Sequence, residues 1–193
     1  MKDGPFVERD KNGNETKIFS EDNAVMTGKQ RYAPWSGGAM TTVAWKGLQL
    51  DLQFTGMFDR YMINNERYFT ENGTFASSHN QSTTMLDMWT TPGQVTDIPA
   101  VDADVEFDTH LLEEASFVRL KMLQLSYTFP TSLMQKTGFI KGAKVYFIGR
   151  NLLTFTGYKG YNVDYAGGTF TPGYNFCSFP SAQSFMGGVL FSF

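Results

Sequence analysis

The residues of this chain with the clearest capacity for chemistry form an alternating acidic run. Asp102, Asp104, Glu106 and Asp108 could supply carboxylate oxygens to Ca²⁺, which prefers oxygen ligands. The run lacks the glycine and the closing glutamate of an EF-hand loop. A solvated acidic loop is therefore the first interpretation, and a calcium site is the second.

No other group of residues has a catalytic or metal-binding spacing. His79 and His110 lie far apart, and neither belongs to a motif such as HExxH. Cys177 is the single cysteine, which excludes an internal disulfide and a cysteine zinc cluster. We expect neither an enzyme nor a bound cofactor.

A second group of candidates consists of aromatic residues in predicted loops. Flat rings stack on sugar faces and on peptide side chains, so these residues could contact a substrate. Packing between loops, or against a partner protein, is the alternative interpretation. The candidates are Trp35, Trp89, Tyr158, Tyr161, Tyr165 and Tyr174.

Composition favours strands and turns. Of the 193 residues, 16% are aromatic and 19 are glycine, whereas 18% are charged and the net charge is −3. Aromatic residues suit pleated surfaces and glycine suits turns, and the absence of a basic face excludes nucleic acid as a partner. No run approaches the roughly 18 apolar residues of a membrane helix, but a membrane strand needs only about 9–11 residues.

Alternation of apolar and polar residues predicts the strands. In 48–55 every second residue is Leu or Phe, which places the apolar side chains on one face. With 38–45 and the turn Lys46-Gly47, this segment predicts a β-hairpin. Further strands are predicted at 116–129, with a β-bulge near Met122-Leu123, and at 143–155 and 182–193. A helical turn capped by Thr131 or Ser132 is expected to end at Gly138.

The connections alternate between long and short. Long loops on one side and short turns on the other are typical of bacterial outer-membrane barrels. The predicted fold is all-β: about five antiparallel C-terminal strands of an incomplete transmembrane barrel with long extracellular loops. The predicted parts are an outside loop at 1–36, a hairpin at 37–58, a long outside loop at 59–115 and the last three strands in 116–193, with no plug domain.

The last predicted strand has the pattern of a barrel-assembly signal. Apolar or aromatic residues recur in it up to the final phenylalanine. These residues are Phe185, Val189, Phe191 and Phe193. Aromatic residues near the strand ends would suit the headgroup girdle of an outer membrane, and they are Trp45, Tyr127, Phe129, Tyr146 and Phe155.

Three stretches resemble the C-terminal end of the SusC/RagA family of TonB-dependent transporters. They are ASFVRLKMLQLSYTFP at 115–130, AKVYFIGRNLLTFTGYKGYNVD at 143–164 and the final strand, and MWTTPGQVTDIP at 88–99 is similar to a loop of that family. Met122 departs from the polar residue that the family often has there.

The resemblance implies an importer of glycan fragments or peptides in the outer membrane of a Gram-negative, Bacteroidota-like cell. It implies as partners a SusD-like lipoprotein over the mouth, outer-membrane lipid, and the TonB system, which acts through a plug that this chain lacks. About five strands are too few to close a barrel, so the resemblance also implies a fragment of a longer protein.

Two alternatives remain open on the sequence alone. A secreted or surface β-sandwich that binds glycans would also show one apolar face on its strands. A non-functional truncated remnant of a transporter would show the same family-like stretches. The terminal Phe193, the loop alternation and the family-like segments all favour transport.

Overall fold

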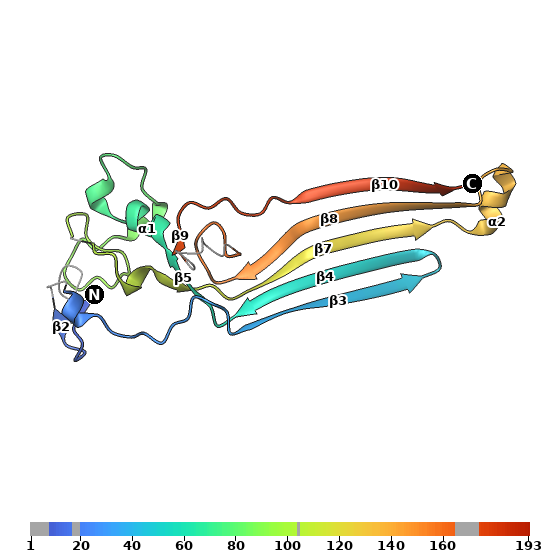
Figure 1. Ribbon diagram of the computed structural model, residues 1–193. Coiled ribbons are helices and arrows are strands. Elements are labelled where there is room, and N and C mark those ends of the chain that lie inside the picture. The colour runs from blue at the N-terminus through green and yellow to red at the C-terminus, as the bar shows by residue number, and fades with distance from the viewer. Residues whose placement is uncertain (1–7, 17–19, 104, 165–173) are drawn as a thin grey trace.

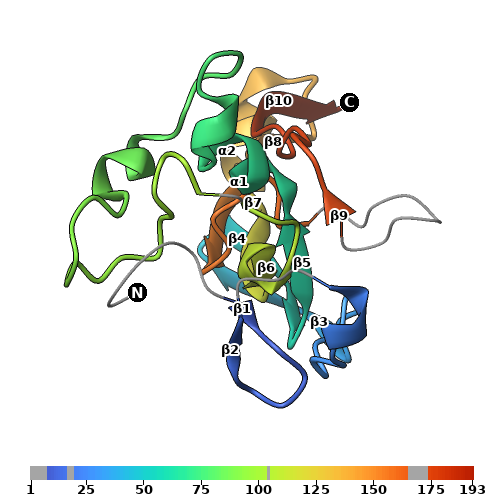
Figure 2. The same ribbon diagram turned by 90° about the vertical axis from the view of Figure 1, so that its left-hand side faces the viewer.

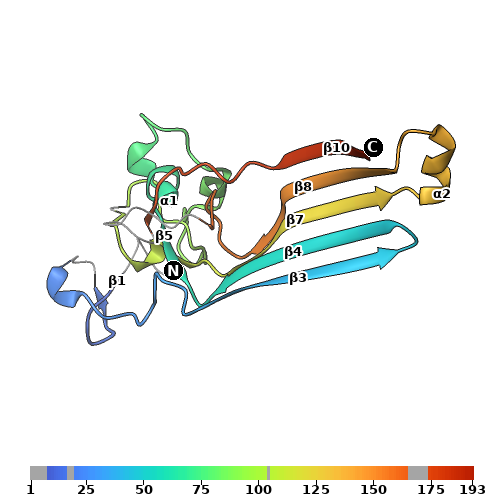
Figure 3. The ribbon, with the colours of Figure 1, turned by 45° about the vertical axis from the view of Figure 1, so that its right-hand side comes forward.

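The molecule combines an elongated antiparallel sheet with a folded layer of loops at one end of it. We describe a computed structural model, in which residues 8–16, 20–103, 105–164 and 174–193 are placed. The sheet consists of β3 (Trp35–Trp45), β4 (Leu48–Phe58), β7 (Phe117–Thr128), β8 (Gly142–Thr156) and β10 (Ser184–Ser192). Figures 1 and 3 show these strands side by side, with the chain end of β10 beside the short connections.

All neighbouring strands of this sheet are antiparallel, in the order β10-β8-β7-β4-β3. The predicted all-β fold with about five antiparallel strands is therefore confirmed. In the described part of the chain nothing pairs with the outer edge of β3 or of β10, so the sheet is open, as an incomplete barrel would be.

The two short connections lie at the same end of the sheet. Lys46 and Gly47 both have positive φ, 46° and 88°, which is the type I′ turn that suits a two-residue hairpin. A Cβ at Gly47 would come 2.6 Å from the carbonyl oxygen of Thr128, so glycine is required. The second connection, residues 129–141, holds α2 (Thr131–Met134) and η5 (Gln135–Thr137), and Gly138 caps the end of η5.

The start of the α2 turn differs from the prediction. Pro130 occupies the N-cap position and makes no side-chain hydrogen bond, and Thr131 and Ser132 lie inside the helix. The prediction that one of them caps the turn was wrong. The predicted end is confirmed, since Gly138 adopts the left-handed conformation at φ 80°.

A β-bulge in β7 keeps the apolar residues before and after it on the same face of the sheet. The register of β7 shifts between Leu120 and Met122 against both neighbouring strands, so Lys121 is the extra residue, one position before the predicted pair. On β8 the same irregularity coincides with Asn151, at φ 54°. Leu120 and Leu123 therefore share a face although they are three residues apart.

Paired residues lie on the same face, and the register places the large apolar side chains of the sheet mostly together. Apart from Lys121 in the bulge, every charged residue of these five strands lies on the opposite face. The large residues of the apolar face are Trp35, Val43 and Trp45 on β3; Leu48, Leu50, Leu52, Phe54 and Phe58 on β4; Val118, Leu120, Leu123, Leu125 and Tyr127 on β7; Val145, Phe147, Leu153 and Phe155 on β8; and Phe185, Val189 and Phe191 on β10.

The other end of the sheet carries what we call the loop layer, residues 59–116 and 157–183 (Figure 2). Its small sheet places β5 (Tyr61–Asn64) between antiparallel β6 (Leu112–Glu114) and parallel β9 (Tyr174–Asn175). The helical elements are α1 (Asn65–Thr70), η2 (Gly73–Phe75), η3 (Thr83–Asp87) and η4 (Thr109–Leu111). Earlier in the chain lie β1 (Glu8–Arg9), β2 (Glu15–Thr16) and η1 (Glu21–Asn23).

A buried core lies in the loop layer and at its junction with the sheet. Met62, Ala115, Phe117, Tyr158 and Val163 form one cluster. The helix α1 begins only at Asn65, because residues 61–64 pair with β6 and β9. Tertiary pairing thus determines where this helix begins.

Among the described residues, no helix is long and apolar enough to cross a membrane.

Candidate functional site

The predicted substrate-contact aromatics are distributed over several parts of the molecule. Trp35 begins β3 and lies on the apolar face of the sheet, where 72% of it is exposed. The last two residues of segment 1–36, which was predicted as a loop, therefore belong to β3. Trp89 is half-buried in the loop layer. Tyr174 lies in β9, and Tyr165 falls outside the described residues.

Tyr158 and Tyr161 lie close in the chain but have opposite environments. Tyr158 is 6% exposed, and its hydroxyl accepts a hydrogen bond from Asn175 Nδ2 at 3.2 Å. Burial raises its pKa to about 12, so the hydroxyl stays neutral. Its ring lies over Gly160, where a Cβ would come 2.5 Å from it. Tyr161 is 68% exposed and is the aromatic candidate that is available for contact.

Tyr161 lines two clefts. The first, which we call the α1 cleft, has a volume of about 580 Å³ and lies between α1, residues 79–84, residues 159–161 and Phe176-Cys177. The second, the β8 cleft, has a volume of about 550 Å³ and lies between the loop end of β8 and residues 180–183. The β8 cleft lies at the loop end of the sheet, whereas the α1 cleft lies within the loop layer.

The wall of the α1 cleft combines aromatic rings with charged groups. The ring centroids of Phe69 and Phe176 are 5.5 Å apart. Arg67 Nε donates to Glu71 at 2.7 Å, and its Nη1 donates to Glu113 at 3.0 Å. Both ion pairs are mostly shielded from water, and the pair with Glu113 links α1 to β6.

Glu113 connects three segments of the loop layer. Its carboxylate accepts from Asn64 Nδ2 at 3.2 Å, from Arg67 at 3.0 Å and from the backbone N–H of Lys159 at 2.9 Å. Because β5, α1 and the 157–161 turn all donate to one carboxylate, Glu113 fixes the position of the turn that carries Tyr161.

Glu66 lies at the base of the α1 cleft and is 7% exposed. Its Oε1 accepts from the backbone N–H of Cys177 at 2.8 Å. Burial is the largest cause that raises the pKa of this carboxyl above its usual range, and the charge of Glu113 adds to it.

The sequence did not point to this carboxyl. The single local signal was the charged run Glu66-Arg67 before two aromatic residues, with Glu71 four positions after Arg67.

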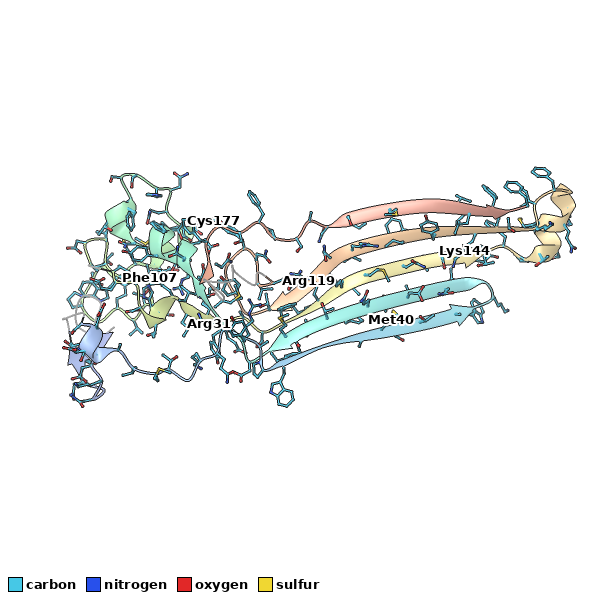
Figure 4. The ribbon with its side chains drawn as sticks, in the orientation of Figure 1. Arg31, Met40, Phe107, Arg119, Lys144 and Cys177 are labelled. Carbon is cyan, nitrogen blue, oxygen red and sulfur yellow. The ribbon has the colours of Figure 1, made fainter. Side chains whose placement is uncertain are left out.

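Arg119 contributes a charged side chain to the wall of the β8 cleft. Its side chain is buried on the polar side of β7, where Nε donates to Thr154 at 2.9 Å and Nη1 donates to Asp164 at 2.8 Å. Figure 4 shows Arg119 where the sheet meets the loop layer, with Lys144 toward the opposite end. The pair with Asp164 ties the 157–164 turn to the sheet.

The polar face of the sheet carries its own hydrogen-bond network. Asp51 Oδ1 accepts from Thr42 at 2.6 Å and from Gln49 at 2.9 Å, and its Oδ2 accepts from Gln124 at 3.4 Å. Three adjacent strands thus share a polar surface opposite the apolar residues.

The described residues of the acidic run, Asp102, Glu106 and Asp108, do not form a metal-binding group. Asp108 caps η4, and its Oδ1 accepts from the backbone N–H of His110 at 2.7 Å. Asp102 is exposed, and Asp104 falls outside the described residues. Within the part of the chain that is described, no group of three or more His, Cys, Asp or Glu residues could hold a metal ion.

Residues of the proposed assembly signal lie along β10 and just after it. Phe185, Val189 and Phe191 share the apolar face, and all are exposed, as is Phe193. Phe185 stacks on Phe147 of β8 with centroids 6.0 Å apart, and Phe193 stacks on Phe139 at 6.4 Å. Among the expected girdle residues, Tyr146 departs from the prediction because it lies on the polar face, over Gly188.

No family model matches the chain, but individual proteins do. TonB-dependent receptor P26 of Formosa agariphila is 28% identical over 95% of this chain, and receptor P39 of the same organism is 20% identical over 98%. The solved RagAB peptide importer in its open-open state superposes with a TM-score of 0.84 at 38% identity, over 97% of the chain. The chain is a relative of the TonB-dependent receptors.

The closed-closed state of the RagAB peptide importer gives the same result, with a TM-score of 0.82 and 39% identity over 96% of the chain. The SusC/RagA resemblance of the sequence is thereby confirmed. This receptor-like chain spans about a fifth of the length of these relatives, 19% of each curated receptor and 20% of each solved chain.

Proposed function

We propose that this chain forms the C-terminal strands and outside loops of a TonB-dependent importer in the outer membrane. The observation that carries the proposal is the separation of the two faces of the sheet. The large apolar side chains lie mostly on one face, and the charged side chains outside the bulge lie on the other. A barrel wall between lipid and a polar lumen has this arrangement.

Strand length and the loop layer support the same proposal. β3 and β4 have 11 residues each and β7 has 12, and about 9–11 residues of a tilted strand cross the hydrocarbon core. A β-sandwich would cover the apolar face with a second sheet, and in the described residues none covers it. Further strands of the longer protein are proposed to pair with β3 and β10.

Peptides are the favoured substrate class, because the solved relatives are states of the RagAB peptide importer. A SusD-like lipoprotein is proposed to cover the loop layer, and TonB is proposed to act through a plug elsewhere in the longer protein. Among the aromatic candidates we favour Tyr161 for substrate contact, because its side chain is exposed, whereas Tyr158 is buried and Trp35 lies on the apolar face.

The test is uptake by cells that carry the native gene. An antibody against residues 59–115 should detect a protein several times longer than 193 residues in the outer-membrane fraction. Cells should accumulate a fluorescent peptide, and deletion of either this gene or TonB should reduce uptake to background. A matched sugar-uptake assay controls for general membrane damage. Uptake that survives both deletions would contradict the proposal.

A further inference from the structure

The wall of the α1 cleft contains an unusual concentration of unpaired hydrogen-bond acceptors. Three of its side chains have a buried oxygen that receives no hydrogen bond from any described residue. These atoms are Asn64 Oδ1, Glu66 Oε2 and Gln81 Oε1. Buried polar atoms are nearly always paired, and each unpaired one costs on the order of 1–3 kcal/mol. Their gathering in one cleft points to a ligand.

The orientations of the two amides are fixed by their partners. Asn64 Nδ2 donates to the carboxylate of Glu113 at 3.2 Å. Gln81 Nε2 donates to the backbone oxygens of Phe69 at 3.1 Å and of His79 at 3.2 Å. Because carboxylate and carbonyl oxygens only accept, the amide nitrogens must face them, and the amide oxygens remain acceptors.

All three unpaired atoms are therefore acceptors that need a hydrogen-bond donor, and one of them belongs to a carboxylate. Arg67, the neighbouring cation, is engaged with Glu71 and Glu113 and not with Glu66. A group with several N–H donors and a positive charge would satisfy the three oxygens together. A primary ammonium has three such donors.

The rest of the cleft fits an apolar stem behind that ammonium group. Phe69 and Phe176 form an aromatic wall, and Tyr161 lies across from α1 on the 159–161 turn. Aromatic faces attract cations and pack on methylene groups. The three oxygens are shielded from water, so a ligand can reach them only when side chains in the wall of the cleft move.

We propose that the α1 cleft binds an alkylammonium group, the side chain of a lysine in an imported peptide. This inference rests on the proposed function and adds a preference for basic peptides over neutral peptides and glycans. Glu66 supplies the charge, Asn64 and Gln81 supply neutral acceptors, and the aromatic wall holds the methylene stem.

Binding to the purified full-length receptor tests the proposal. The probe is an acetylated and amidated pentapeptide with a central lysine, and the reference is the same peptide with norleucine, which keeps the stem and lacks the charge. Calorimetry should show the lysine peptide binding about tenfold or more tightly than the reference, the size expected for a charge-assisted hydrogen bond. Glu66→Gln should remove that difference, and Glu21→Gln, an exposed glutamate outside the clefts, should retain it.

The pH dependence separates a binding role from a structural one. The charged and titratable groups around Glu66 are Arg67, Glu71, His79, Glu113, Tyr158, Lys159 and Cys177. Lysine-peptide affinity should fall as pH is lowered through the raised pKa of Glu66, and Glu66→Gln should abolish this fall. Heat-modifiable migration of the variant on gels confirms that it is folded.

Several results would overturn the proposal. Equal affinity for the two peptides, or a lysine preference that survives in folded Glu66→Gln, would exclude Glu66 as the anchor. Binding of Ca²⁺ alone that depends on Glu66, with no lysine preference, would assign the oxygens to a metal. Binding of maltotriose but of neither peptide would reject the ammonium site and leave the importer proposal intact, which cell uptake tests separately.

Discussion

The sheet and the loop layer of this molecule are stabilised in different ways. In the sheet, the side chains of the edge strands β3 and β10 are mostly exposed and those of β4, β7 and β8 are mostly half-buried or buried, and backbone ladders hold the strands together. In the loop layer, short elements surround buried residues such as Met62 and Leu111, together with buried polar groups such as Asn64 and Asn175. The loop layer therefore has its own core, whereas no layer of the described residues covers the apolar face of the sheet.

The largest effect should come from a charge on the apolar face. Leu50→Lys, in the middle of β4, should destabilise the membrane-inserted receptor by about 3 kcal/mol, because a lysine would lie near the bilayer midplane. Gln49→Lys, on the polar face of the same strand, should have little effect. Urea unfolding in phospholipid vesicles measures both, and equal losses would refute the assignment of faces.

Truncation of the loop-layer core should have the next largest effect. Met62→Ala should cost about 2–3 kcal/mol, because Met62 is fully buried and the cavity cannot close completely. Met186→Ala, on the exposed face of β10, is the matched control. Limited proteolysis should cut 59–115 faster in Met62→Ala and leave the sheet resistant. Protection equal to that of the control would show that the loop layer has no core of its own.

The hairpin turn should be sensitive to a single methyl group. Gly47→Ala should cost about 1–2 kcal/mol, because φ is 88° and the Cβ would meet Thr128 at 2.6 Å. Gly187→Ala, whose Cβ would have ordinary contacts, provides the control. Folding yield into vesicles and the urea midpoint report the difference. An unchanged midpoint for Gly47→Ala would mean that the turn is not of this type.

A smaller effect should appear in the pH dependence of the loop layer. The folded pKa of Glu66 is raised, mainly by burial, so the folded form holds its proton more tightly than the unfolded form does. This contribution is complete below the unfolded pKa near 4.5 and is lost as pH rises through the folded pKa. The protection of the α1 amides against hydrogen exchange, measured relative to the intrinsic exchange rate at each pH, should therefore fall over that window in the wild type. An equal loss of protection in Glu66→Gln would assign the effect to another group.

The regular parts of the fold could be read from the sequence. The alternation of Leu48 to Phe54 gave the faces of β4, and Lys46-Gly47 gave the turn, because both are local patterns. The bulge predicted near Met122-Leu123 is confirmed at the adjacent residue, Lys121.

The candidate site could not be read in the same way. Glu66 meets Cys177, 111 residues away, and Glu113 meets Arg67, 46 residues away. No periodicity encodes such contacts, and the pairing of β5 with β9 depends on the same long-range folding. The exposed aromatic residue Tyr161 was found from its type, but its neighbours in the cleft were not.

Spin labelling along β4 tests the central claim most directly. In a full-length receptor with Cys177→Ser, single labels at Gln49→Cys, Leu50→Cys, Gln53→Cys and Phe54→Cys report access to oxygen in the bilayer and to a water-soluble nickel reagent. We expect high oxygen access at Leu50 and Phe54, and nickel access at Gln49 and Gln53. Equal access at all four positions, or the reverse pattern, would contradict a strand between lipid and a polar lumen.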